Sequence, residues 1–515
     1  MYKKYLLLIG LFISIVAAAQ VPEDALRYSF YPQNGTARNL AIGGANGSLG
    51  GDINSIFVNP AGLGFYKTGE IVFSPAYILN NNKNSFRGTN SANKKEGFNL
   101  GTTGFVVGSP MAGRNSKSSQ AFSIAFTQTA NFNNVIQYGG LNDSSSYAEQ
   151  WAEEVAKSGQ SIDGILNGAQ YAYGSAPAVY TYLVDTVRIN GMLQVKAAPE
   201  YILDAGQAVR QQMLQTTRGG IYEVALGYAY NKNDKWYFGG TLGVPFVSYT
   251  SNTEFKEADT SSVTNNHFKD FTYHDYFKTT GVGINGILGV IYRPKEYIRL
   301  GLSVHTPTYY VMNDSRNSDL AVNLENPVYA ASVSSATFTS GVDGQAKYTQ
   351  LSPWKAIISG SYVFREVANV KRQKGFITAD IEYVNYRGSR FGSNNQTPTQ
   401  DEKDYYKSLN NVITQQYKGN FNFRVGGELK FNVIMGRLGF AYYTNPYKDA
   451  ELKANKMLLS GGLGYRNKGM FIDLTYVHNI SKDVNFPYRL EDRANTFAVV
   501  KNTRGNITAS IGFKF

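Results

Sequence analysis

Residues 421–433 alternate between apolar and polar side chains without a break. Phe421 and Phe423 stand on the apolar side of this pattern, and Arg424 and Glu428 stand on the polar side. Successive side chains of a β-strand point to opposite faces, so the segment is predicted to be a strand with one apolar and one polar face. Its apolar face meets either a protein core or lipid.

Fourteen segments of the chain carry this alternation between turn residues. They are residues 71–80, 97–108, 120–132, 219–230, 235–249, 281–292, 297–306, 353–365, 376–386, 421–433, 436–443, 457–466, 469–478 and 505–515. In the fourth segment Tyr222, Leu226 and Tyr228 oppose a set of small residues and Glu223. Only the second set is small and polar enough to line a filled interior.

The links between these segments alternate strictly between short and long. The short links are residues 109–118, 231–234, 293–296, 366–374, 434–435 and 467–468, and the long links are 81–96, 133–218, 250–280, 307–352, 387–420, 444–456 and 479–504. An up-and-down transmembrane barrel has short turns at one rim and long extracellular loops at the other. A soluble propeller or stack of sandwiches is the alternative, but neither requires a long loop at every second link.

Composition agrees with a barrel and excludes several other classes. The chain has 515 residues, 43% of them hydrophobic, and beyond its first residues it has no apolar stretch near the ~18 residues of a spanning helix. Only every second residue of a barrel strand meets lipid, so a low mean hydropathy is expected. The net charge is +12, but the lysine and arginine residues are scattered along the chain and form no basic patch or nucleic-acid-binding motif. The absence of cysteine excludes disulfides and thiolate metal sites.

The two ends of the chain indicate export to a membrane. Lys3 and Lys4 precede an apolar run that ends in Ala17-Ala18-Ala19, so residues 1–19 are predicted to be a signal peptide cleaved after Ala19. The last segment ends on the aromatic Phe515. It resembles the closing strand of bacterial outer-membrane barrels, and this resemblance implies recognition of Phe515 by the barrel-assembly machinery and location in the bacterial outer membrane.

Residues 20–68 lack the alternation and are rich in glycine, including Gly43 and Gly44. Glycine permits tight bends and close backbone approach. Leu40, Ile42 and other apolar residues give the segment enough surface to pack, which argues against a flexible linker. We therefore expect an all-β transmembrane antiparallel barrel of about 14 strands over residues 69–515, with residues 20–68 as an N-terminal hatch, or plug, inside the lumen.

Residues 35–45, followed by Asp52 and by Asn59-Pro60-Ala61, resemble the hatch of the FadL-type outer-membrane transporters of long-chain fatty acids and other hydrophobic compounds. Residues 299–307, 352–354, 424–428 and 512–515 are similar to strand signatures of that family. The resemblance covers nearly the whole mature chain and implies a fourteen-stranded barrel.

The resemblance also implies a mechanism without a cofactor. A hydrophobic ligand is caught by apolar extracellular loops, enters a pocket in the barrel, and leaves sideways through the wall when the hatch rearranges at Gly43, Gly44, Asn59, Pro60 and Ala61. In this family an inward kink of the third strand opens the wall. Residues 120–132 contain no glycine or proline to mark it, so positions near Ala130-Asn131 and near Gly139-Gly140 both stay open.

Five residues are candidates for contact with the ligand. In the long link 133–218, residues 147–157 and 201–214 have helical composition, with Trp151, Val155, Met213 and Leu214 as candidate lining; packing within the loop is the alternative. Arg424 is a candidate for binding a ligand carboxylate through paired hydrogen bonds. The alternative is that Arg424, with Asp380 and Glu382, only solvates the lumen.

The sequence contains no motif for catalysis. His267 and His274 lie near Asp270 and Asp275 without a diagnostic metal spacing, so no metal site is predicted. His305 follows Ser303 on one predicted face, where a barrel residue with ordinary hydrogen bonds is favoured over a catalytic pair. No nucleophile elbow or Walker loop is present, and no enzyme is predicted.

Two alternatives to the transporter stay open: an open porin-like channel for polar solutes, and a same-fold barrel serving protein secretion or surface attachment.

Overall fold

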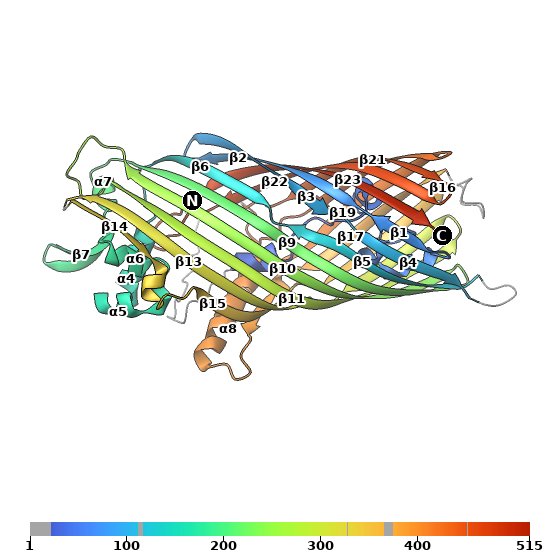
Figure 1. The fold of residues 1–515 in the computed structure, drawn as a ribbon, viewed down its shortest axis with the longest axis horizontal. Helices are drawn as coiled ribbons and strands as arrows, with labels where there is room; N and C mark the ends of the chain where they lie inside the picture. Colours follow the sequence, from blue (N-terminus) through green and yellow to red (C-terminus); the bar gives the residue numbers. More distant parts are fainter. Residues whose placement is uncertain (1–21, 112–116, 327, 365–373, 451) are drawn as a thin grey trace, which may run out of the picture.

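The computed structural model describes residues 22–111, 117–326, 328–364, 374–450 and 452–515. The predicted signal peptide, residues 1–19, lies outside the described residues. The described strands form a closed antiparallel barrel of fourteen spans (Figure 1). In chain order the spans are β1 (Glu70–Phe73) with β2 (Pro75–Phe86), β3 (Thr89–Leu100) with β4 (Thr103–Pro110), β5 (Ser119–Asn131) with β6 (Asn134–Asn142), β9 (Val209–Lys232), β10 (Trp236–Asp259), β11 (Asp270–Lys295), β12 (Ile298–His305) with β13 (Tyr309–Glu325), β14 (Val328–Ser334) with β15 (Gly344–Leu351) and β16 (Lys355–Phe364), β17 (Gly375–Asn385) with β18 (Arg390–Ser393), β19 (Gly419–Phe431), β20 (Ile434–Tyr443), β21 (Lys456–Asn467), β22 (Met470–Asn485) and β23 (Ala498–Lys514).

The last strand closes the barrel by pairing with the first span. Phe73 lies opposite Ile511, and Ala76 lies opposite Thr508. Each of the fourteen predicted segments falls on one span, so the predicted strand number and the all-β barrel are confirmed.

The two faces of the wall differ as the alternation predicts. On β19 the side chains of Asn422 and Arg424 are buried in the interior, whereas Phe421 and Phe423 are exposed on the outside. The same outward apolar pattern recurs around the wall, which is the arrangement of a transmembrane barrel.

Three predicted long links are largely strand, and their assignment as loops is wrong. Residues 81–96 continue β2 and β3 up to a tight turn at Arg87 and Gly88, both with positive φ. Residues 250–280 and 307–352 likewise extend β10, β11, β13, β14 and β15. Apolar alternation stops where the outward residues become polar, as at Lys94 and Glu96, although the backbone ladder continues.

The barrel has a turn end and a loop end. The short connections at 233–235, 296–297, 432–433 and 468–469 lie at the turn end, while the predicted short links 109–118 and 366–374 fall partly outside the described residues. Helices and a separate hairpin cover the loop end (Figure 1). These elements are α4 (Glu149–Ser158), α5 (Ile162–Asn167), η2 (Ala169–Tyr171), α6 (Ser175–Tyr180), β7 (Val184–Ile189), β8 (Met192–Ala197) and α7 (Glu200–Asp204).

The prediction of helix over residues 201–214 is wrong for its second half. Helix α7 ends at Asp204, and β9 begins at Val209. Every residue from Val209 to Lys232 has a partner on β10, so pairing with the wall outweighs the local helical composition.

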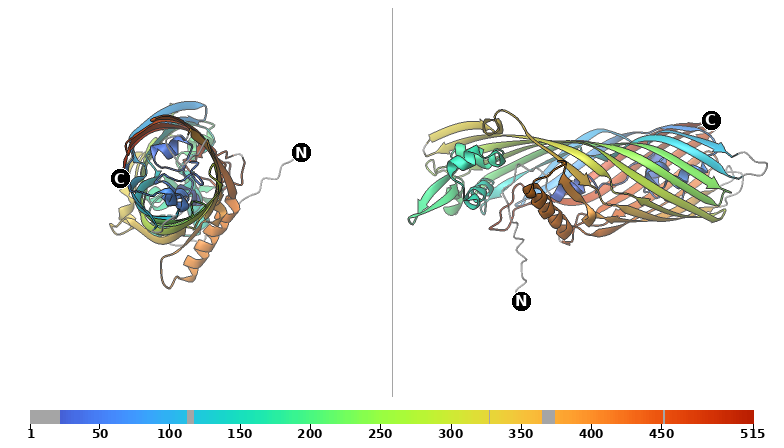
Figure 2. Two further views of the ribbon diagram at one scale, coloured as in Figure 1. Left: turned by 90° about the vertical axis from the view of Figure 1, so that its right-hand side faces the viewer. Right: turned by 90° about the horizontal axis from the view of Figure 1, so that it is seen from below.

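The N-terminal residues from Pro22 to Thr68, the internal segment, lie inside the ring of strands (Figure 2, left). Their helices are α1 (Pro22–Arg27), α2 (Ala37–Ala41), α3 (Ser55–Val58) and η1 (Pro60–Phe65). Helix α2 contacts β20 to β23, whereas η1 contacts β5, β9, β10 and β11. The segment thus reaches from one side of the lumen to the other.

The remaining helices belong to the loops of the middle strands. They are η3 (Ser335–Phe338), η5 (Tyr386–Gly388) and α8 (Gln400–Gln416). Helix α8 begins with a capping box between Thr399 and Glu402 and lies outside the wall (Figures 1 and 2). Within the described ranges, no helix combines the length and apolar character needed to cross a membrane.

Candidate functional site

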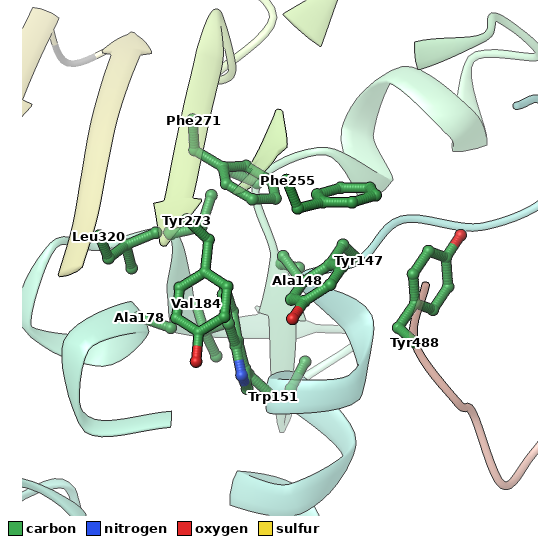
Figure 3. Packing of buried hydrophobic residues seen from close by; sticks show 14 of the residues in the cluster. Tyr147, Ala148, Trp151, Ala178, Val184, Phe255, Phe271, Tyr273, Leu320 and Tyr488 are labelled. Atoms are coloured by element: carbon green, nitrogen blue, oxygen red, sulfur yellow. The ribbon is translucent and has the colours of Figure 1, made fainter. Parts of the chain in front are cut away.

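An aromatic cluster fills the loop end of the barrel (Figure 3). Tyr147 and Trp151, at the start of α4, pack against Phe255 of β10 and Tyr273 of β11. The ring centroids of Tyr147 and Phe255 are 4.4 Å apart, and those of Trp151 and Tyr273 are 5.1 Å apart. The helical loop therefore shares one apolar core with the barrel wall.

Three of the four apolar candidates from the sequence meet in this cluster. Trp151, Val155 and Met213 are all buried there. Leu214 lies on the other face of β9, where its partner on β10 is Glu254. Residues 209–214 form a strand, so neighbours in sequence point in opposite directions.

Two carboxylates fix the start of α4 to its surroundings. Glu257 of β10 accepts hydrogen bonds from the Tyr147 backbone at 3.1 Å and from the Gln211 amide at 2.7 Å. Glu149 accepts from the Ser146 backbone at 2.7 Å and pairs with Arg493 at 3.0 Å. Burial raises the pKa of Glu149 to about 7.

Asn59, Pro60 and Ala61 fix the internal segment to one side of the wall. The Asn59 side chain accepts from the Ala61 N–H at 3.2 Å, and its amide donates to the carbonyls of Gly47 at 2.6 Å and Val290 at 3.2 Å. It thus caps η1 and joins it to β11. Opposite Pro60, a Cβ on Gly239 would lie 2.3 Å from the Pro60 carbonyl carbon, so this contact requires glycine.

Gly43 and Gly44 fix the other side of the internal segment. Both have positive φ, +68° and +79°. A Cβ on Gly43 would lie 2.7 Å from the Phe440 carbonyl oxygen, and the Gly43 N–H donates to Ser460 at 3.2 Å. Asn59, Pro60 and Ala61 therefore sit at a contact with β10 to β12, and Gly43 sits at a contact with β20 and β21, whereas the wall residue next to Gly44 is Arg424 of β19.

Arg424 faces the interior, as predicted, within a group of ion pairs. Its Nη1 lies 3.4 Å from Glu382 Oε2, and its Nε lies 3.7 Å from Asp380 Oδ2. Asp380 also accepts from the Gly47 N–H of the internal segment at 3.2 Å. The guanidinium is compensated by protein carboxylates, and its Nη2 has no hydrogen-bond partner among the described residues.

A central cavity of about 140 Å³ lies between the internal segment and the wall. Tyr31 and Asn34 of the internal segment line it, together with wall residues such as Glu223, Lys355 and Arg424. Most of the residues that line the cavity carry a polar group, although apolar atoms make up the larger part of its surface.

The wall is discontinuous between its second and third spans. The β4 and β5 ladder begins at Thr103 opposite Phe126. Beyond it, β3 has a described ladder with β2, and β6 has one with β9, but none joins β3 to β6. The register of the third span shifts between Gln128 and Ala130. This irregularity lies next to the first of the two kink positions that the sequence left open.

Asparagine side chains close this discontinuity, which we call the seam. At its base, the Asn34 amide donates to Leu100 O at 2.9 Å and to Gln128 O at 2.8 Å, joining the two strands through the internal segment. Above it, three buried asparagines of β2 donate to β6. These bonds join Asn80 to Asn134 at 2.7 Å, Asn82 to Val135 O at 2.5 Å and Asn84 to Gln137 O at 2.7 Å.

Sequence reasoning missed these asparagines. They recur at every second position in a run with little apolar character, which resembles a loop when apolar alternation is the criterion. The period of two is nevertheless a strand signal, and it was available in the sequence.

The histidines have ordinary structural partners. His305 Nε2 and Ser303 Oγ both contact the Val58 carbonyl, at 3.0 and 2.8 Å, so these two side chains serve the packing of the internal segment. His267 contacts the Asn326 carbonyl, His274 pairs with Glu254, and His478 contacts Tyr476. Within the part of the chain that the structure describes, no group of three residues is arranged to hold a metal ion.

Solved structures with this architecture are titled as a FadL homologue and as toluene transporters. A FadL homologue of Pseudomonas aeruginosa has a TM-score of 0.54 and 12% identity, covering 95% of this chain and 99% of its own. The toluene transporters TodX of P. putida and TbuX of Ralstonia pickettii have TM-scores of 0.51 and 0.50 with 13% and 15% identity; each alignment covers 94% of this chain and at least 99% of the other. Comparisons with protein-family models and with curated protein sequences gave no match. At these identities the likeness shows the fold, and the expected FadL-type fold is confirmed.

Proposed function

We propose that this protein moves hydrophobic small molecules passively across the bacterial outer membrane. Two features of the structure together carry the proposal. The internal segment obstructs the lumen, and beside it the wall has a seam that only side chains close. The internal segment contacts opposite walls, and Asn34 and the β2 asparagines replace the missing ladder between β3 and β6. Side-chain hydrogen bonds can separate without breaking a strand pair, so the seam is the place where the wall opens most readily.

The route begins at the aromatic cluster. Trp151, Val155 and Met213 are the proposed first apolar contacts for the ligand; they belong to the buried apolar cluster at the loop end, so the loop must open to admit the ligand. The ligand then reaches the central cavity and leaves through the base of the seam, between Leu100 and Gln128, where the nearby outward residue Phe98 is apolar. A sideways exit delivers it to lipid, which avoids a cost of about 0.8 kcal/mol for each methylene group returned to water. The flow follows the ligand's own concentration difference, without a cofactor.

The internal segment is the proposed gate. Asn59, Pro60 and Ala61 hold it on one side, and Gly43 and Gly44 hold it on the other. Asn34 connects it directly to both borders of the seam. A shift of this segment would therefore release the base of the seam and enlarge the central cavity together.

The proposed location of the protein in the outer membrane, and its orientation there, follow from the same architecture. Residues 1–19 direct export, Phe515 is read by the barrel-assembly machinery, and the outer belt is solvated by outer-membrane lipid. The Phe515 N–H donates to Gly69 O at 3.0 Å, so the last residue takes part in barrel closure. The loop end then faces the cell exterior.

Liposome measurements separate this function from an open pore. Purified protein in liposomes is expected to admit labelled toluene or a labelled fatty acid faster than empty liposomes do, while small sugars leak no faster. Rapid sugar leakage would favour a porin. Co-purification with exported proteins, without ligand uptake, would favour a role in secretion or surface attachment.

A further inference from the structure

The central cavity contains a carboxylate that the surrounding ion pairs do not use. Glu223 projects inward from β9 and is buried, and its Oε1 accepts one hydrogen bond, from the Asn285 amide at 2.9 Å. Among the described residues no lysine or arginine nitrogen lies within 4.0 Å of it. The cavity cations are engaged elsewhere: Arg424 pairs with Asp380 and Glu382, and Lys355 lies 3.7 Å from Glu382.

Other polar atoms around this cavity are also unsatisfied. Gln33 Nε2, Asn34 Oδ1, Asn285 Oδ1 and Arg424 Nη2 have no hydrogen-bond partner among the described residues. Each belongs to a residue that lines the cavity. A buried polar atom without a partner is costly, so several around one space indicate that a polar group occupies it.

We infer that the cavity receives the head group of an amphiphile that donates hydrogen bonds, such as an alcohol or an alkylammonium. This inference rests on the proposed function and narrows its substrate class. The acceptors Glu223, Asn34 Oδ1 and Asn285 Oδ1 outnumber the unsatisfied donors Gln33 Nε2 and Arg424 Nη2, so a donating head group satisfies more of these atoms than an accepting one. A carboxylate head would face Glu223 with like charge, and a bare hydrocarbon would leave all these atoms unsatisfied. The hydrocarbon tail of the ligand then lies toward the apolar residues between the cavity and the loop end.

Three water-soluble probes with the same tail test this inference. Hexan-1-ol, hexylammonium and hexanoate are titrated into the full-length mature protein in amphipol, and binding is measured by isothermal titration calorimetry. We expect both donor heads to bind at least tenfold more tightly than hexanoate. Glu223→Gln is expected to weaken hexylammonium at least tenfold. Glu254→Gln, on the outward face of β10, is the matched control and leaves all three affinities unchanged.

Hexanoate binding as tightly as the other probes would overturn the inference. An unchanged order of affinities in Glu223→Gln would also overturn it. If no probe bound at all, the cavity would hold only water, and the inference would be wrong. Uptake of labelled hexylammonium by the same protein in liposomes is measured in parallel. Failure of that uptake with the predicted binding order intact would refute the transport function and leave the head-group site standing.

Discussion

Asparagine supplies hydrogen bonds where the backbone of this barrel lacks a partner. Asn59 caps η1 and joins it to the wall, while Asn34 joins the borders of the seam. A short amide that both donates and accepts suits such positions. The sequence marked Asn59 through the adjacent Pro60 and Ala61, but it gave no reason to select Asn34, whose importance comes from strands more than sixty residues away.

Replacing Asn59 and Pro60 together by alanine is expected to leave the barrel folded and to slow uptake several-fold. The change removes three side-chain hydrogen bonds of Asn59, none of which belongs to the strand ladder. One of them is the cap of η1, which contributes about 1 kcal/mol. Uptake of a labelled hydrophobic compound is measured at equal surface abundance. Asn445 and Pro446, the same pair of residues in a rim loop, provide the matched alanine control; equal uptake by both variants would refute the role of Asn59.

At the scale of elements, the lipid-facing parts of the strands were predictable and their extensions were not. Outward side chains such as Leu288 and Leu302 form an apolar belt around the barrel, and within this belt the sequence alternates strongly between apolar and polar residues. Beyond the belt the same strands expose polar residues, so β2, β3 and β13 look like loops. Helix α4 was predictable from its composition, but the end of the predicted helix at 201–214 was not, because pairing with β10 determines its conformation.

Docking of α4 is expected to weaken as the pH rises from 5 to 8.5. The pKa of Glu149 is about 7 when it is buried, above the ordinary value of 4.5 that it regains on exposure. The stability that buried Glu149 gives to the docked helix is therefore complete below about pH 4.5 and is lost as the pH rises through 7. Hydrogen exchange of the α4 amides, corrected for intrinsic rates, should show several-fold greater protection at pH 5. Burial also raises the pKa of Glu257, which holds the start of α4, to about 7. Glu149→Gln combined with Glu257→Gln should therefore remove most of that difference and Glu153→Gln should not; a flat profile in the unmodified protein contradicts the prediction.

The whole molecule is a barrel whose outside is solvated by lipid. Leu438 and Leu288 are 74% and 71% exposed in the absence of lipid, and similar residues surround the wall. Each such side chain left in water forgoes roughly 1.5–3 kcal/mol of burial. The mature chain should therefore aggregate when detergent is removed, as measured by light scattering and sedimentation. A folded monomer in plain buffer would contradict the membrane assignment.

A reversible lock across the seam tests the transport route most directly. The Asn82 amide lies 2.6 Å from Asn134 Oδ1, and the chain has no native cysteine, so Asn82→Cys with Asn134→Cys allows a specific disulfide. Val107→Cys with Phe122→Cys, on paired positions of β4 and β5, is the control. Uptake of a labelled hydrophobic compound should fall to background in the oxidised seam variant, recover on reduction, and stay unchanged in the control. Undiminished uptake through the locked seam would contradict the account.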